Sequence, residues 1–208
     1  MCLYYIQEEP IDNEIMRFLP YEAKLESSLT CFPQELCVMA DGAEVAACPD
    51  KLPEIARWVA ALPQIKRLIF HISTTEPEKT VIDIKNLPGT VRFVNGSTDA
   101  TSGCGNPEII IAVGKSGREE ICEAVASLAK EGVSSDEVDE AAIERHLRFK
   151  VSPDFVIKTG GSHLTDFLIW QSVYSELFFT DVNWNRFRRV DFLRALRDFQ
   201  SRERRFGK

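Results

Sequence analysis

A basic residue and two glycines follow a short apolar run in the last third of the chain. Phe155–Ile157 has the length and composition of a buried strand, and Lys158, Gly160 and Gly161 come soon after it. Open α/β sheets bind ligands at the ends of such strands. Thr165 can cap a helix that begins there, and a helix N-terminus attracts phosphate through its free N–H groups and its dipole. The sequence therefore predicts a diphosphate site at this point.

The elements that would position this site alternate along the chain. The expected strands are Leu36–Met39, Lys66–Ile72, Val91–Val94, Ile109–Val113 and Phe155–Ile157. The expected helices are Ile11–Leu29 with an interruption near Pro20, Leu52–Leu62, Gly117–Lys130, Ser135–Leu147, Thr165–Tyr174 and Val190–Arg202. The glycine- and serine-rich stretch Asn95–Pro107 is expected to be a surface loop. Strands separated by helices predict an α/β fold with a central, mostly parallel sheet flanked by helices.

Length and charge narrow the class of protein. The 208 residues, 44% of them hydrophobic, suffice for one domain over residues 1–208, with an N-terminal helical segment at 1–30 and a basic tail at 200–208. A net charge of -7 and the lack of a basic face argue against a nucleic-acid partner. No apolar run approaches the roughly 20 residues of a membrane span, and no signal peptide is evident. We expect a cytoplasmic protein, at most peripheral to a membrane.

The six cysteines show no pairing typical of a metal site. They have neither a CxxC spacing nor histidines at matching distances, so we expect free thiols in a reducing compartment. The cysteines are Cys2, Cys31, Cys37, Cys48, Cys104 and Cys122.

Several segments together resemble the cis-prenyltransferases, the undecaprenyl and dehydrodolichyl diphosphate synthases. Their C-terminal signature is similar to Ser152–Gly161, Leu164–Gln171, Tyr174–Val182 and the closing Arg202–Gly207. Ile111–Ile121 is similar to the family's strand followed by Gly-Gly-Arg-x-Glu, with Arg118 at the arginine. The resemblance is strong after Ile109 and weak before it. It implies a dimeric, Mg²⁺-dependent enzyme that adds isopentenyl diphosphate to an allylic diphosphate, with the substrate diphosphate at Lys158, Gly160, Gly161 and Thr165.

The first strand end departs from the family's pattern. Active members follow Asp-Gly with Asn-x-Arg-Trp and then a Gly-His-x-x-Gly phosphate cradle, whereas Asp41 and Gly42 run here into Ala43–Cys48. Glu44 would repel a diphosphate at this place. Asp-Gly commonly forms a turn, so Asp41 is only a weak candidate for a metal ligand and no other is expected.

Two further departures affect the hydrophobic tunnel and the second diphosphate ligand. Thr75–Pro88 contains two prolines and no apolar helical stripe, so it cannot form the helices of about 20 residues that wall a tunnel about 30 Å long. Only Ser162 and His163 stand where active members carry Glu-x-Arg, and Lys158 gives a point charge in place of an arginine fork.

The tail and an aromatic segment retain features of a subunit interface. Arg205-Phe206-Gly207 resembles the Arg-x-Gly tail that family dimers extend into the partner's active site, where Arg205 and Gly207 would contact substrate diphosphate. The alternative for the tail is a frayed basic segment without a function. The alternative for the aromatic residues is packing in the core of this chain. The residues expected at the interface are Trp170, Tyr174, Glu176, Phe178, Phe179, Asp181 and Arg118.

This combination favours a non-catalytic subunit similar to the Nogo-B receptor, which pairs with a catalytic cis-prenyltransferase subunit. The chain would donate Arg205 and Gly207, while the partner supplies the tunnel and holds Mg²⁺. One alternative is a divergent homodimeric enzyme that acts on isopentenyl diphosphate itself, since the same face could pair with a second copy. The other is a binding protein that reuses the fold for an unrelated task.

Overall fold

The computed structural model describes residues 20–76, 82–84, 86–95, 98–114, 117–161 and 168–202. Its centre is a seven-stranded sheet in the order β4-β3-β5-β2-β1-β6-β7, in which only β4 runs antiparallel to its neighbour. The predicted α/β fold with a mostly parallel sheet is therefore confirmed. The strands are β1 Glu35–Asp41, β2 Arg67–Ser73, β3 Thr90–Asn95, β4 Thr98–Gly103, β5 Glu108–Gly114, β6 Phe155–Lys158 and β7 Glu176–Phe179.

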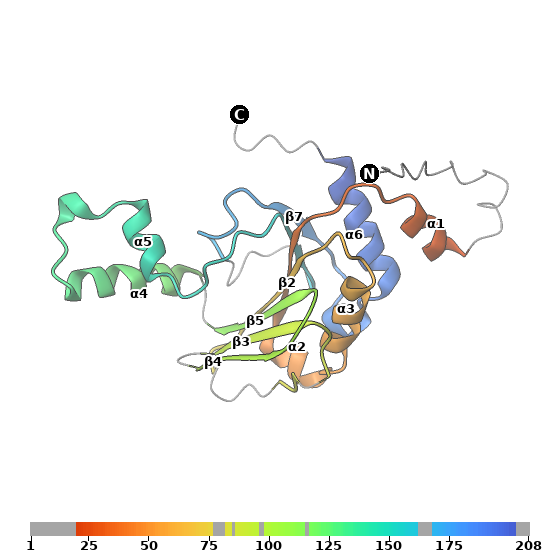
Figure 1. Cartoon of the computed structure of the whole chain (residues 1–208), viewed down its shortest axis with the longest axis horizontal. Helices are drawn as coiled ribbons and strands as arrows, with labels where there is room; N and C mark the ends of the chain where they lie inside the picture. The colour runs from red at the N-terminus through yellow and green to blue at the C-terminus, as the bar shows by residue number, and fades with distance from the viewer. Residues whose placement is uncertain are drawn as a thin grey trace, which may run out of the picture.

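The helices are unevenly distributed around this sheet (Figure 1). α3 and α6 pack against one face, and α1 lies on the outer side of α6. α4 and α5 form a hairpin that projects away from the sheet on the left of the view. The helices are α1 Tyr21–Ser27, α2 Gly42–Ala47, α3 Lys51–Ala60, α4 Gly117–Lys130, α5 Glu140–His146 and α6 Arg189–Ser201, with 3₁₀ turns η3 Ser135–Glu137 and η4 Trp184–Arg186.

The two faces of the sheet have different covers. The larger core lies under α3 and α6, where Ile55 and Phe192 are fully buried against strand residues such as Phe70. The smaller core on the opposite face is closed by Phe149 and Leu168, which belong to connecting segments. Burial on both faces explains why the central strands read as continuous apolar runs.

Some predicted elements are wrong. Asn95–Pro107 is largely a strand, because β4 pairs with β3 along its whole length. Thr90 lies opposite Gly103 at one end of this pairing, and Asn95 lies opposite Thr98 at the other. All six residues of β4 are exposed, so no apolar alternation marks it. Ser135–Leu147 is divided into η3 and α5, since Asp139 begins a new helix by accepting the Ala142 N–H.

The predicted helix Thr165–Tyr174 is also wrong for the part that the structure describes. Residues 169–174 form turns, and the strand β7 that follows was not predicted. Of the predicted helix Ile11–Leu29, residues 21–27 are helical, and the part before Pro20 lies outside the described residues. No helix within the described ranges is long and apolar enough to cross a membrane.

Candidate functional site

The ends of the parallel strands meet at one edge of the sheet. Asp41 ends β1 and pairs in register with Ser73 of β2, which pairs with Gly114 of β5. Lys158 ends β6 beside Met39 of β1. The residues that the sequence places after separate strands therefore lie along a common carboxyl edge, which is where α/β sheets bind ligands.

Asp41 starts a helix at this edge. Its Oδ1 accepts the N–H of Ala43 at 2.8 Å and caps α2. A Cβ added at Gly42 would lie 2.9 Å from Cβ of Thr74, so this position accepts only glycine without movement of β2's end. The described residues contain no group of three or more His, Cys, Asp or Glu side chains placed to hold a metal ion. The observed role of Asp41 is thus a helix cap.

The Gly160–Gly161 turn is held by the chain's own carbonyls. Gly160 and Gly161 have φ of 76° and 116°, a region that favours glycine. Their N–H groups donate to the carbonyls of Val182 and Thr180, both at 3.1 Å. The two donors that the sequence suggests for a phosphate therefore join this turn to the segment after β7.

A carboxylate and a lysine flank the same turn. A Cβ added at Gly160 would lie 3.5 Å from Oε1 of Glu44, so the acid of α2 lies against the turn. Lys158 Nζ donates to the carbonyl of Thr159 at 3.0 Å, and the buried Thr159 hydroxyl donates to the Met39 carbonyl at 3.3 Å. The fourth predicted ligand, Thr165, lies outside the described residues.

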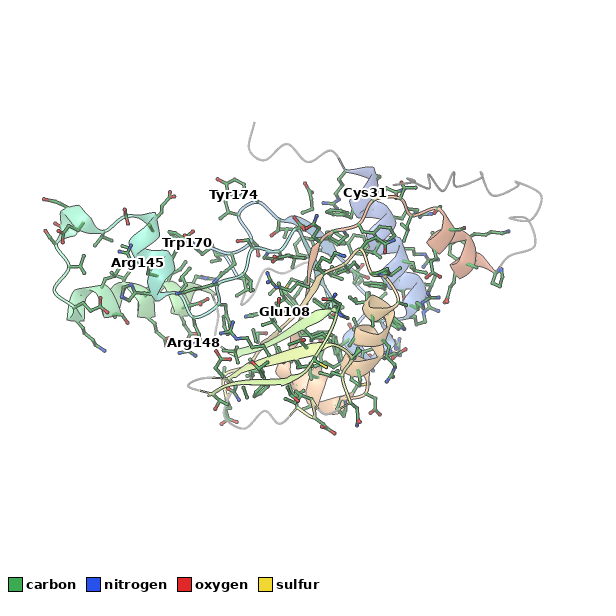
Figure 2. The ribbon with its side chains drawn as sticks, in the orientation of Figure 1. Cys31, Glu108, Arg145, Arg148, Trp170 and Tyr174 are labelled. Carbon is green, nitrogen blue, oxygen red and sulfur yellow. The ribbon has the colours of Figure 1, made fainter. Side chains whose placement is uncertain are left out.

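The residues predicted at an interface are spread over two regions. Trp170 and Tyr174 lie in the turns before β7 and face the α4–α5 hairpin across a groove (Figure 2). Trp170 Nε1 donates to Glu144 of α5 at 3.4 Å, and Tyr174 is 68% exposed. The groove has a volume of about 720 Å³ and is lined by Glu140, Glu144, Leu147, Phe149, Lys150, Val151, Ser152, Pro153, Asp154, Trp170, Gln171, Val173 and Tyr174.

The other predicted interface residues differ in exposure. Phe178 is half-buried and packs on Phe155 with ring centroids 6.3 Å apart, whereas its neighbour Phe179 is exposed. Arg118 on α4 and Asp181 after β7 are also exposed. Glu176 accepts a hydrogen bond from Arg202 Nη1 at 3.1 Å. An interface role is compatible with the exposed residues, and for each of them it stays a prediction.

A buried carboxylate fixes the turns that carry Trp170 and Tyr174. Glu120 of α4 accepts the Phe149 N–H at 2.8 Å and the side-chain amide of Gln171 at 2.9 Å. Gln171 also donates to the Phe149 carbonyl at 3.0 Å. This network joins α4 to the segments that close the smaller core, and no local pattern in the sequence indicates it.

Replacing Glu120 with alanine is expected to lower the free energy of unfolding by about 2 kcal/mol, because two buried donors lose their acceptor. Urea unfolding followed by circular dichroism measures the change. Glu119→Ala removes a neighbouring exposed carboxylate and is expected to change stability by less than about 0.5 kcal/mol. Equal losses in both variants would contradict a role for the buried network.

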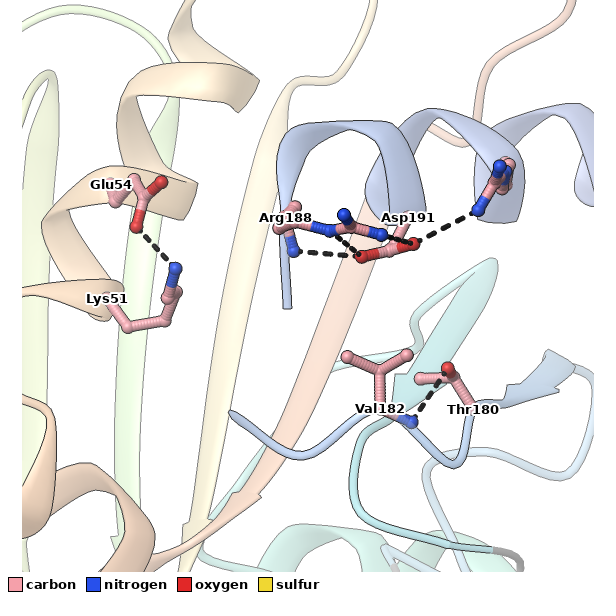
Figure 3. Close-up of polar contacts among 7 residues, drawn as sticks. Lys51, Glu54, Thr180, Val182, Arg188 and Asp191 are labelled. Carbon is pink, nitrogen blue, oxygen red and sulfur yellow. Dashed lines mark hydrogen bonds and ion pairs between the residues drawn. The ribbon is translucent and has the colours of Figure 1, made fainter. Parts of the chain in front are cut away.

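A second depression lies beside the Gly160–Gly161 turn and was missed by sequence reasoning. It has a volume of about 660 Å³ and is lined by Asp181, Val182, Asn183, Asn185, Arg186 and Arg188. These residues resemble an ordinary polar loop, so only the tertiary structure brings them to the carboxyl edge. Figure 3 shows Thr180 and Val182 in the same view as Arg188, whose guanidinium contacts Asp191.

The described chain ends at the opposite edge of the sheet. Arg202 follows α6 and forms ion pairs with Asp198 and with Glu176, the first residue of β7. In Figure 1, α6 ends near the top of the view and α2, which follows β1, lies at the bottom. Arg205 and Gly207 themselves lie outside the described residues.

Comparison with known proteins covers mainly the C-terminal part of the chain. Residues 79–207 match the model of the family described as "Putative undecaprenyl diphosphate synthase". The isoprenyl transferase of Deinococcus radiodurans is 47% identical over 132 residues, which are 58% of this chain and 48% of that protein. A tritrans,polycis-undecaprenyl-diphosphate synthase (geranylgeranyl-diphosphate specific) of Methanocaldococcus jannaschii is 47% identical over 107 residues, 47% of this chain and 38% of that protein. The chain spans about half the length, or less, of these curated relatives.

Solved structures show the same fold over most of the chain. Lavandulyl diphosphate synthase from Lavandula x intermedia, in complex with dimethylallyl diphosphate, has a TM-score of 0.61 at 22% identity and covers 85% of this chain and 99% of its own. An undecaprenyl diphosphate synthase from Campylobacter jejuni, described as probable, has a TM-score of 0.59 at 19% identity, covering 86% of this chain and 100% of its own. At these identities the likeness supports the fold alone.

Proposed function

Since this chain belongs to the cis-prenyltransferase family, we propose that it is a subunit of a heteromeric cis-prenyltransferase and is not itself catalytic. The observation that carries this proposal is the filled strand-end turn. The N–H groups of Gly160 and Gly161 are used by carbonyls, and the Glu44 carboxylate lies against the turn. A diphosphate at this place would meet negative charge, and the N–H groups of Gly160 and Gly161 would not be available to it.

The covering of the smaller core supports the same proposal. A growing polyprenyl chain needs a long apolar cavity, and here Phe149 and Leu168 close the sheet face with 6% and 1% exposure. None of the described residues between Ser73 and Thr90 is helical. Chain elongation would therefore take place on the partner, which would also hold Mg²⁺ through its own carboxylates.

The position of Arg202 supports a role for the tail on the partner subunit. Arg202 is bound at the amino edge of the sheet, whereas Gly160 lies at the carboxyl edge, five residues after the first residue of β6. Five strand residues span about 16 Å. The backbone from Arg202 to Arg205 covers at most about 11 Å. The last described residue, Arg202, is thus held at the edge opposite this turn, which is compatible with a tail that acts on a partner's active site.

A homodimeric, catalytic cis-prenyltransferase is the second candidate. The names of the relatives favour it, because the relatives are called transferases and synthases. Several of them are 46–51% identical to this chain over the matched residues. The family match, however, begins at residue 79 and leaves out Asp41 and Glu44. In this second form, Asp41 would have to bind Mg²⁺ through the oxygen that its cap leaves unused, and Lys158 would have to leave the Thr159 carbonyl.

Incorporation of labelled isopentenyl diphosphate distinguishes the two candidates. The assay contains a short allylic diphosphate and Mg²⁺, with this chain alone, a catalytic homologue from the same source alone, or both mixed. Activity that needs the mixture supports the heteromeric enzyme. Product from this chain alone would establish the catalytic homodimer and overturn the non-catalytic role. If this chain does not co-purify with the homologue and none of the samples is active, an unrelated binding function is favoured.

A further inference from the structure

The strand β4 leaves one edge of the sheet open. It is the last strand in the sheet order, and among the described residues it pairs only with β3 (Figure 1). All six of its residues are exposed. No backbone hydrogen bond within the described ranges joins its outer side to another segment. A row of backbone donors and acceptors is therefore available to another extended strand.

β4 lacks the features that usually protect an edge strand. None of its residues, Thr98–Gly103, is a lysine or a proline. Each of them lies opposite a single residue of β3, so the strand has no bulge. Its one charged side chain, Asp99, accepts a hydrogen bond from Arg92 Nε at 3.0 Å. The edge thus carries no unbalanced charge that would repel a second strand.

The pairing of β3 identifies the backbone groups of β4 that point outward. The Thr90 N–H donates to the Pro107 carbonyl at 3.2 Å, on the side of β3 that faces β5. Successive residues of a strand direct their N–H and C=O groups to opposite sides, so those of Phe93 point to β4. Phe93 is paired with Ala100. The backbone groups of Ala100 therefore point to β3, and those of its two sequence neighbours point outward.

We propose that β4 pairs antiparallel with β4 of a second copy of this chain, about a twofold axis at Ala100. In this register Asp99 of each copy lies opposite Thr101 of the other, and each of these two pairs exchanges two backbone hydrogen bonds. Ala100 meets Ala100 of the second copy at the closely spaced position without hydrogen bonds, where a small side chain fits. The two sheets then continue into each other.

The charges on this edge favour a second copy as the occupant. Arg92 lies opposite Thr101 in the β3–β4 pairing, so the register places Asp99 of the second copy in line with Arg92, beyond Thr101. Each Arg92 then lies between an aspartate of its own chain and one of the other copy, which is a favourable arrangement. A twofold axis at Asp99 would instead place two carboxylates opposite each other and is disfavoured.

This surface is separate from the strand expected at the interface of the heteromeric enzyme. Phe178 and Phe179 belong to β7, which lies at the other end of the sheet order. The inference therefore does not depend on the proposed function. If both hold, pairing through β4 joins two heteromers into a larger assembly.

Sedimentation velocity of the isolated chain, from about 1 to 200 µM, measures the self-association. Thr101→Pro removes one outward N–H from each copy and no hydrogen bond of the β3–β4 pairing, so it should raise the Kd of the dimer about 10-fold or more. Thr101→Val keeps the N–H and the shape of the side chain, and as the matched control it should leave the Kd within about threefold. Circular dichroism checks the fold of both variants.

A disulfide crosslink tests the register without a proline. Ala100→Cys places the two introduced thiols on Cα atoms about 4.5 Å apart, within the range of a disulfide. Mild oxidation followed by peptide mass spectrometry should detect a disulfide between the two introduced thiols. The native Cys104 is exposed and lies just after β4, so it serves as the internal control and should crosslink to its own copy about 10-fold less.

Several results would overturn the pairing through β4. They are a monomer over the whole concentration range, an equal Kd in Thr101→Pro and Thr101→Val, and equal crosslinking at Cys104. Self-association that is lost in Tyr174→Asp and kept in Thr101→Pro would place the second copy on the other face and would overturn it as well. None of these readouts uses enzyme activity, so failure of this inference is distinguishable from failure of the proposed function.

Discussion

Replacing Arg205 with alanine is expected to lower the turnover of the mixed enzyme roughly 100- to 1,000-fold, the usual cost of losing one group that stabilises developing negative charge. The side chain would act on diphosphate bound at the partner, so the fold of this chain should not change. Incorporation of labelled isopentenyl diphosphate by the mixture, at equal subunit concentrations, measures the loss. Thermal unfolding and co-purification of the variant should match those of the parent chain.

Two other tail variants sharpen this test. Lys208→Ala removes a neighbouring positive charge outside Arg205-Phe206-Gly207 and is expected to retain turnover within about twofold. Arg205→Lys keeps the charge and loses the guanidinium fork, so it should recover only part of the activity. Full activity of Arg205→Ala would show that the tail has no role in turnover. An equal loss with Lys208→Ala would show that the tail acts only as a general positive charge.

The central strands were predictable because burial on both faces leaves a simple pattern. Ile109–Val113 was expected and lies within β5, and Lys66–Ile72 differs from β2 by one residue at each end. A parallel strand covered on both sides must be apolar throughout. This pattern depends on the strand itself and on no distant partner, so the local sequence is enough to predict the strand.

The elements that were missed depend on tertiary contacts. β4 is an exposed edge strand, and its Asp99 forms an ion pair with Arg92 of β3, which no periodicity reveals. The turns at residues 169–174 carry a helix-like apolar pattern, but Gln171 is bound to Glu120, far away in the sequence. Tertiary hydrogen bonds of this kind override local propensity.

The candidate site was predictable in position but not in chemistry. Lys158, Gly160 and Gly161 do lie at the carboxyl edge, as the order of the elements required. Sequence could not show that the glycine N–H groups would be taken by the carbonyls of Thr180 and Val182. Those bonds depend on β7, which was not predicted, so the local sequence could not reveal these partners.

Stability is expected to fall as the pH is lowered from 6.5 toward 4, because His71 is buried without a hydrogen-bond partner on either ring nitrogen. Burial, together with the nearby charge of Lys158, lowers the pKa of His71 to about 4 from the usual 6.5. The unfolded chain binds this proton more readily, so each step down in this pH range favours unfolding. The full contribution is about 3 kcal/mol, and it is present above pH 6.5.

His71→Leu is expected to flatten this dependence, because the variant has no proton to bind and leaves no buried donor unpaired. Its stability at pH 7.5 should equal or exceed that of the parent chain, since replacing an unsatisfied buried polar group by an apolar one removes a desolvation cost. Urea unfolding followed by tryptophan fluorescence at pH 7.5, 6.5, 5.5 and 4.5 measures both effects. An unchanged slope in His71→Leu would assign the loss of stability to other groups.

His146 supplies a control of opposite sign. The Ala142 carbonyl and Glu131 raise the pKa of His146, so its protonation stabilises the fold, and this contribution is complete below pH 6.5 and is lost as the pH rises through the raised pKa. His146→Gln should therefore remove a gain of stability on acidification near and above pH 6.5, whereas His71→Leu removes a loss of stability below pH 6.5. Because both variants remove one histidine, opposite changes in slope would separate the effect of burial from a general effect of histidine content. Changes of the same sign would contradict the assignment to His71.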